Sequence, residues 1–424
     1  MHVPTEAFFG SAKIWVTHQE NDFFFFQVKE GIVPSRGIVS QKHYAITHDE
    51  VSQQFKTYWT PFWLRDQESE QWHAEPWAEF LSEIDAIDIP QFPLKIDLEN
   101  FDLWKATIKK LKNSKVVGVC GWRHEELKLL PDNAIQHLIF AMKRIFVSGF
   151  SPNCMQARTV LLAKVPEPKD MSQTRPITIL GCIVRLVSKL ISDQLLIQLQ
   201  AFLPFPVSGE VPNRGAKDLT LQQQYIIEKS LELQNGLCGY TLDLVKAFYM
   251  IPRFPLMVLF RKFGIPETVT AFWVNNLAHL TRLLQIGSAL GPALRSTCGF
   301  PEKDSMSVLG MVVLSSSFFY RIATPRISPF CYADNWSWIA KDSREHFRTL
   351  ITGLNWVHSL KMKIDQNKSW AWATSPALRA CIQEFNYIFP SGDETINIKH
   401  DATDLGMYIH SDKKASLGSI AERL

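Results

Sequence analysis

Two aspartates each stand at the end of a short apolar run, where a carboxylate has a fixed place. Asp243 follows Gly239-Tyr-Thr-Leu, and Asp334 follows Phe330-Cys-Tyr-Ala. The β-favouring residues predict strands, and Asp334-Asn335 predicts the turn of a β-hairpin. Magnesium prefers one or two carboxylates completed by substrate phosphate oxygens, and paired metal ions serve in-line phosphoryl transfer. If the two strand ends converge, the sequence predicts a site for two Mg²⁺ (or Mn²⁺) ions.

Two cations upstream fit the same chemistry. Lys164 follows the predicted strand 159–163, and Arg175 begins the predicted strand 175–180. Neighbouring strands would bring the two side chains together, and an arginine fork beside a lysine point charge suits a triphosphate. Surface cations flanking an ordinary hairpin, and an ordinary solvated turn at Asp334, are the alternatives.

These residues lie in segments that resemble the motifs of reverse transcriptases, above all those of non-LTR retroelements and group II introns. Asp243-x-x-Lys-Ala-Phe248 resembles motif A, and Tyr332-Ala-Asp-Asn335 resembles motif C. The other similar segments follow in the family's order: Lys164 with Arg175-Pro-Ile for the fingers, Val207–Asp218 before motif A, Cys298–Ser307 for motif B, Leu360–Ser369 for motif D and Asp401–Ile409 for motif E. The resemblance covers roughly residues 110–415. It implies an α+β right-hand polymerase fold, with fingers and a palm whose antiparallel sheet is flanked by helices.

The resemblance also implies roles for individual residues. Lys368 would protonate the leaving pyrophosphate, and the Phe248 ring would lie under the sugar and exclude a 2′-OH. The alternatives are that Phe248 is a core residue and that Lys368 is a solvated surface lysine. The predicted catalytic residues are Asp243, Asp334, Asn335 and Lys368, with the metal ions at Asp243 and Asp334; the predicted nucleotide-binding residues are Lys164, Arg175, Phe248 and Glu302.

Several positions depart from the family pattern. Asn335 replaces the second aspartate of motif C, and Glu302 stands where glutamine is usual. Lys303 replaces a glycine, which is costly if the backbone there has a positive φ. Arg214 is a candidate backbone or template contact, and Lys246 is expected to face solvent.

A chain of 424 residues is too long for one compact core, so several subdomains are expected. The resemblance supplies their order. We predict an N-terminal extension forming a mostly helical cap (1–95), fingers (96–235), a palm with motifs A to D (236–400), and a primer-grip-like hairpin with the start of a truncated thumb (401–424).

Charge and cysteine content narrow the function classes. Residues 1–100 carry 7 Lys and Arg against 16 Asp and Glu, whereas residues 101–200 carry 15 against 7. A basic segment beside clustered carboxylates suits a protein that binds a phosphate backbone, although a solvated basic helix face would give the same distribution of charge. Seven scattered cysteines argue against zinc sites and disulfides, and favour a reducing intracellular compartment, nuclear or cytoplasmic. No membrane span or signal peptide is expected.

Three functions remain open from the sequence. The first is an RNA-directed DNA polymerase that uses an RNA template, a DNA or RNA primer and dNTPs. The second is a catalytically weakened or inactive nucleic-acid-binding protein, which Asn335 and Lys303 motivate. The third is an RNA-templated RNA polymerase, which Phe248 opposes.

Overall fold

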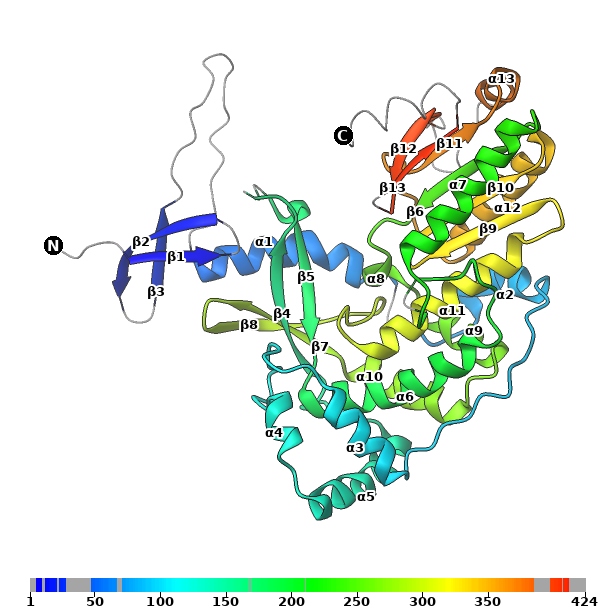
Figure 1. Cartoon of the computed structure of the whole chain (residues 1–424). Helices are drawn as coiled ribbons and strands as arrows, with labels where there is room; N and C mark the ends of the chain where they lie inside the picture. The colour runs from blue at the N-terminus through cyan, green and yellow to red at the C-terminus, as the bar shows by residue number, and fades with distance from the viewer. Residues whose placement is uncertain are drawn as a thin grey trace.

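The structure is a computed structural model. It describes residues 5–9, 12–20, 23–27, 47–66, 71–166, 168, 170–209, 211–384, 397–405 and 407–411. Helices and strands are mixed along the chain, and two four-stranded sheets stand apart with helices packed around them (Figure 1). The α+β class predicted from the sequence is therefore present.

The sheet that carries both predicted aspartates has the strand order β11-β6-β10-β9 and is antiparallel throughout. Its strands are β6 (Cys238–Asp243), β9 (Ile327–Tyr332), β10 (Asn335–Ala340) and β11 (Trp370–Ala373). Side chains alternate between its faces, as strand geometry requires. Tyr240, Trp336 and Trp338 enter the main core, whereas Ile339 and Trp372 enter a second cluster on the opposite face. The β6 sheet is therefore buried on both sides.

Helices cover the two faces of the β6 sheet. Helix α11 (Ser305–Ile322) and helix α12 (Ser343–Ser359) pack on the main-core face, and helix α7 (Ala216–Glu232) packs on the other. Helix α11 is long and apolar enough to cross a membrane, but 72% of that window is buried inside the protein. Its composition is that of a central core helix.

The second sheet has the strand order β5-β4-β7-β8. Its members are β4 (Gln156–Ala163), β5 (Thr174–Ile179), β7 (Thr281–Ile286) and β8 (Ala289–Arg295). The predicted hairpin β4–β5 is confirmed, and β7 joins it in parallel. The β7–β8 hairpin was not predicted from the sequence. The missed signal was Gly287-Ser288, because glycine supplies the positive φ (60°) of a two-residue hairpin turn.

The remaining helices surround these sheets. Helix α5 (Asp132–Ser148) is followed by Gly149, whose positive φ of 77° suits glycine. The set comprises α3 (Phe101–Lys110), α4 (His124–Lys128), α5 (Asp132–Ser148), the 3-10 turn η2 (Met171–Gln173), α6 (Cys182–Gln200), α8 (Ala247–Met250), α9 (Arg253–Lys262), α10 (Glu267–His279) and α13 (Pro376–Glu384).

The N-terminal segment contains strands as well as the expected helices. Its elements are β1 (Thr5–Phe9), β2 (Ala12–Glu20), β3 (Phe23–Gln27), α1 (His48–Trp63), the 3-10 turn η1 (Glu75–Trp77) and α2 (Ala78–Asp85). Strands β1, β2 and β3 form one small antiparallel sheet. Helix α1 begins with a capping box at Thr47 and runs toward α8 (Figure 1). Its Phe55, Trp59 and Trp63 pack with Leu284 of β7 and with Tyr249.

The hairpin expected near the C-terminus is present. Strand β12 (Asp401–Asp404) pairs antiparallel with β13 (Met407–His410). The residues 412–424, where the start of a thumb was expected, lie outside the described residues.

Replacing Asp304 by Asn should make stability less dependent on pH. Asp304 is the N-cap of α11, and burial raises its pKa to about 7. An unfolded aspartate titrates near ~3.9, so the folded state loses stability as pH rises from that value toward 7. Asparagine keeps the size of the side chain without ionising. Urea titrations should therefore show that the free energy of unfolding of Asp304→Asn rises, relative to that of the wild type, by on the order of a few kcal/mol between about pH 5 and pH 8.

The matched control is Asp342→Asn, because Asp342 caps α12 with a partly exposed carboxylate that accepts from the Glu345 amide at 2.8 Å. A stability difference between Asp304→Asn and the wild type that stays constant over this range would contradict the prediction.

Candidate active site

Strand pairing brings the two predicted aspartates together. Asp243 is the last residue of β6, and its partner in register on β10 is Asn335. The two-residue turn between β9 and β10 is Ala333-Asp334 and not the predicted Asp334-Asn335, because Asn335 is the first residue of β10. Paired residues point to the same face of a sheet, so Asp243 and Asn335 are neighbours on the face opposite α11.

The turn that carries Asp334 is held firmly. Ala333 has a left-handed backbone (φ 51°), and its carbonyl accepts from the Ser315 hydroxyl at 2.7 Å and from the Trp336 indole at 2.8 Å. Gly209 lies directly against this turn, because a Cβ there would come 2.1 Å from the Ala333 nitrogen. The segment before motif A therefore requires glycine at this position to let the turn approach.

The electrostatics of the two carboxylates indicate a cation site. Burial raises the pKa of Asp334, and the Asp243 carboxylate raises it further. Burial also raises the pKa of Asp243, against the lowering effect of Lys368. Two acidic groups whose charged forms are disfavoured by burial and mutual repulsion gain stability from a bound cation.

Lys368 acts as a counter-ion for this acidic pair. Its ammonium lies 3.1 Å from Oδ1 of Asp243 and 3.0 Å from Oδ2 of Asp365. Partial burial lowers the pKa of Lys368, but the hydrogen bonds to Asp365 and Asp243 outweigh it and leave that pKa raised. Ser369 accepts from the Asp243 amide at 3.1 Å. Lys368 was predicted from the sequence, whereas Asp365, three residues before it in the same turn, was not.

The two predicted phosphate-binding cations also come together. Lys164 follows β4, and Arg175 lies near the start of β5, opposite Leu162. Burial lowers the pKa of Lys164, and the positive charges of Arg175 and Lys368 lower it further. The Lys164 ammonium donates to the Ser172 carbonyl at 2.9 Å, and the Arg175 side chain is exposed. A cluster of cations that disfavour one another would gain stability from a bound anion.

The segment resembling motif B joins the two sheets. Oε2 of Glu302 accepts from the Thr178 amide of β5 at 2.6 Å, and burial raises the Glu302 pKa. Phe248 is partly buried against the main core, and its carbonyl accepts from the Phe300 amide at 2.8 Å. The predicted contacts of Glu302 and Phe248 with a nucleotide stay predictions. Lys303 is exposed and does not have a positive φ, so its replacement of glycine causes no backbone strain.

Two expectations are wrong. Arg214, expected to be available to template, donates to the carbonyls of Pro204, Val207, Gln200 and Leu203, and so clamps the end of α6 and the following loop. Lys246, expected to face solvent, is half-buried against aromatic rings of α1.

The donor set at Asp243 and Asp334 fits a divalent cation. Within the described residues no three or more His, Cys, Asp or Glu side chains form a metal-binding cluster. Magnesium does not require such a cluster, because it takes one or two carboxylates and completes its shell with water and substrate phosphates.

Comparison with known proteins identifies the family. The family described as reverse transcriptase (RNA-dependent DNA polymerase) matches residues 165–397, which include both aspartates. The chain belongs to the reverse transcriptase family. This membership places it in the nucleotidyltransferase enzyme class, and reverse transcriptase domains generally use divalent metal ions.

A curated relative agrees with this family. It is the "RNA-directed DNA polymerase from mobile element jockey" of Drosophila funebris, 22% identical over 241 residues. The alignment covers 52% of this chain and 26% of the relative, so the chain spans about a quarter of that protein's length.

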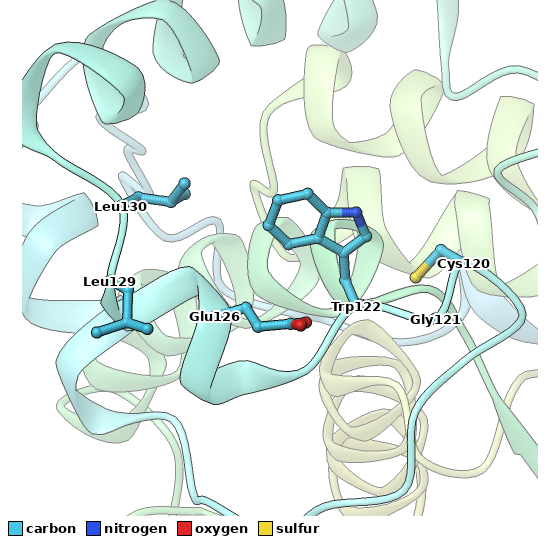
Figure 2. Close-up of a pocket in the computed structure, with 6 residues that line it drawn as sticks. All are labelled: Cys120, Gly121, Trp122, Glu126, Leu129 and Leu130. Carbon is cyan, nitrogen blue, oxygen red and sulfur yellow. The ribbon is translucent and has the colours of Figure 1, made fainter.

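A separate pocket lies beside α4. It is lined by the loop 120–122 and by Glu126, Leu129 and Leu130, as Figure 2 shows. None of the predicted site residues lines it, so it is distinct from the carboxylate site.

Replacing Asp334 by Asn should stabilise the metal-free protein and weaken its response to magnesium. The substitution removes a buried carboxylate that Asp243 repels, so the thermal midpoint in EDTA should rise above that of the wild type. Binding of Mg²⁺ to the folded state should raise the wild-type midpoint, and this increase should shrink or vanish in Asp334→Asn.

The control is Asp193→Asn, whose carboxylate pairs with Lys189 in α6 and should leave the magnesium response intact. A magnesium-induced shift of equal size in Asp334→Asn and the wild type would rule out Asp334 as a ligand.

Proposed function

We propose that the chain is an RNA-directed DNA polymerase of a retroelement. The observation that carries the proposal is the convergence of Asp243 and Asp334 at adjacent ends of the β6 sheet, inside the segment that matches the reverse transcriptase family. In this proposal the β6 sheet with α7, α11 and α12 is the palm of a right hand. The β4 sheet and the helices of residues 96–235 belong to the fingers.

The incoming dNTP would bind between the two sheets. Lys164 and Arg175 come from the β4 sheet and lie near the acidic pair, because the Arg175 charge acts on Asp334 and the Lys368 charge acts on Lys164. A triphosphate placed there would meet an exposed guanidinium fork and a lysine point charge. Binding would also remove the mutual repulsion of the cations.

Asp243 and Asp334 would hold two Mg²⁺ or Mn²⁺ ions, with Asn335 beside them as a neutral oxygen donor. Such ions neutralise phosphate charge and lower the pKa of the attacking hydroxyl. In the reaction the primer 3′-hydroxyl would lose its proton to solvent, its oxygen would form a bond to the α-phosphorus, the bond from that phosphorus to the bridging oxygen would break, and pyrophosphate would leave. The protein contributes chiefly by positioning and by charge stabilisation.

Lys368 is the proposed proton donor to the leaving pyrophosphate. Its ammonium is charged, as its raised pKa requires, and its side chain is 63% exposed. It reaches Asp243 directly, so the donor stands next to the reacting centre. After transfer the neutral amine would recover a proton from solvent.

Asp243→Ala should abolish primer extension. The purified chain is incubated with an RNA template, an annealed primer, dNTPs and either Mg²⁺ or Mn²⁺, and extended primer is resolved by length. Loss of one metal-binding carboxylate should reduce the rate by at least ~100-fold, in line with removing a central electrostatic element. Asp193→Ala is the control for a surface carboxylate.

Absence of extension by the wild type under both metals, with retained salt-dependent RNA binding, would refute the polymerase and support the non-catalytic nucleic-acid-binding protein.

Phe248→Ala should relax sugar selection. The ring is proposed to exclude a ribose 2′-OH, so its removal should raise the efficiency of rNTP incorporation relative to dNTP incorporation, by about 10-fold or more for a steric barrier of 1–3 kcal/mol. The measurement is kcat/KM for matched dNTP and rNTP on one template.

Phe319→Ala is the packing control, since Phe319 is also partly buried against the main core. A wild type that prefers rNTPs would favour the RNA-templated RNA polymerase instead, and an unchanged ratio in Phe248→Ala would remove Phe248 from sugar selection.

A further inference from the structure

Lys246, between Asp243 and Phe248, is enclosed by aromatic rings of helix α1. Its ammonium lies 3.5 Å from the centroid of the Phe62 ring, 4.0 Å from that of Tyr58 and 4.4 Å from that of Trp59. It also donates a hydrogen bond of 2.6 Å to the Tyr58 hydroxyl. Ring faces attract a cation, most strongly where water is excluded. We call Tyr58, Trp59 and Phe62 the aromatic cage.

The backbone of Lys246 explains why such a cage matters. Its φ is 49°, a left-handed conformation that costs a non-glycine residue energy unless the surroundings impose it. This residue is the N-cap of α8, the short helix that carries Phe248. The turn at Lys246 therefore sets the direction of the chain between Asp243 and Phe248.

Helix α1 is itself fixed by the segments around the acidic pair. The Trp63 carbonyl, at the end of this helix, accepts from the Thr297 amide at 2.8 Å and from the Cys298 amide at 3.3 Å, so the helix end is hydrogen-bonded to the start of motif B. Its side chains touch η2 at the tip of the β4–β5 hairpin, where Tyr58 lies near Asp170 and Ser172. One helix thus contacts motif A, motif B and the tip beside Lys164.

This helix lies outside the residues that match the family, which begin at residue 165. We propose that the aromatic cage of α1 holds Lys246 as a positioning residue for nucleotide selection, so that α1 is a working part of the active centre. The proposal rests on the proposed polymerase function. The cage fixes the left-handed turn, the turn fixes Phe248 relative to Asp243, and α1 links both to the phosphate-binding tip.

The test compares Lys246→Met, Lys246→Arg and Phe62→Leu in the full chain with the wild type. Methionine keeps the length and bulk of the side chain but removes the charge that the rings attract. Displacing the Asp243–Phe248 segment by about 1 Å should lower kcat/KM for dNTPs by about 10- to 100-fold and narrow the preference for dNTP over rNTP. Lys246→Arg, which keeps a cation that also binds ring faces, should retain most of the kcat/KM for dNTPs and most of the preference for dNTP over rNTP.

The matched control is Lys399→Met. Lys399 is also partly buried and lies 5.9 Å from the centroid of the Trp370 ring, but it stands outside the segments that resemble the family motifs. It should lower the thermal midpoint while leaving dNTP kcat/KM and sugar preference unchanged. Equal kinetic effects from the two variants, or wild-type kinetics in Lys246→Met, would overturn the proposal.

A second measurement keeps the two proposals separable. Binding of a dNTP with Ca²⁺ is followed by its shift of the thermal midpoint, without any turnover. If the wild type does not extend primers, the polymerase function fails, and the cage is judged by this binding alone. Weaker dNTP stabilisation in Lys246→Met than in Lys399→Met supports the cage, and equal stabilisation overturns it.

Discussion

The pairing of β6 with β10 is the constraint on which the rest of the structure depends. It sets Asp243 opposite Asn335 and brings Asp334 one residue away, so two partly buried carboxylates repel each other at one edge of a sheet. Such a register is maintained only if packing outweighs the repulsion. Here Trp336 and Trp338 of β10, both almost fully buried, fill the main core beneath α11, and a slip of one residue would turn them to the opposite face.

Cations around the acidic pair compensate its charge, one by direct contact and one from a greater distance. Lys368 touches Asp243 directly and is shared with Asp365, whereas Arg175 acts on Asp334 from the other sheet. The cations in turn disfavour one another, as the lowered pKa of Lys164 records. Carboxylates that repel one another would gain stability from a metal ion, and cations that repel one another would gain stability from phosphates. The electrostatics of this site therefore suit the metal ions and the triphosphate of the proposed function.

The sequence was informative where a local pattern decides the structure. Short apolar, β-favouring runs predicted β6, β9 and β10, and Asp334-Asn335 predicted the hairpin to within one residue of its turn, because these features depend on neighbours a few residues apart. The surroundings of Lys246 were not predictable in this way. Its aromatic cage comes from a helix far earlier in the chain, since Tyr58 stands 188 positions before Lys246, and the cage forms only when α1 packs against motif A. The prediction for Arg214 failed for a related reason. The sequence does not show which backbone carbonyls surround a cation, and here they accept the hydrogen bonds of Arg214 that were expected to reach a template.

The departures from the family pattern have a consistent physical effect. A second aspartate at position 335 would put a third carboxylate against Asp243 and Asp334, whose pKa values burial and repulsion already raise. Asparagine keeps an oxygen there without adding that repulsion, at the cost of one charge toward a cation. Glu302, in place of a glutamine, accepts from the β5 backbone, so its extra charge is directed to the junction of the two sheets and away from the acidic pair. The substitutions therefore shift negative charge within the centre and leave Asp243 and Asp334 as the two carboxylates of the proposed cation site.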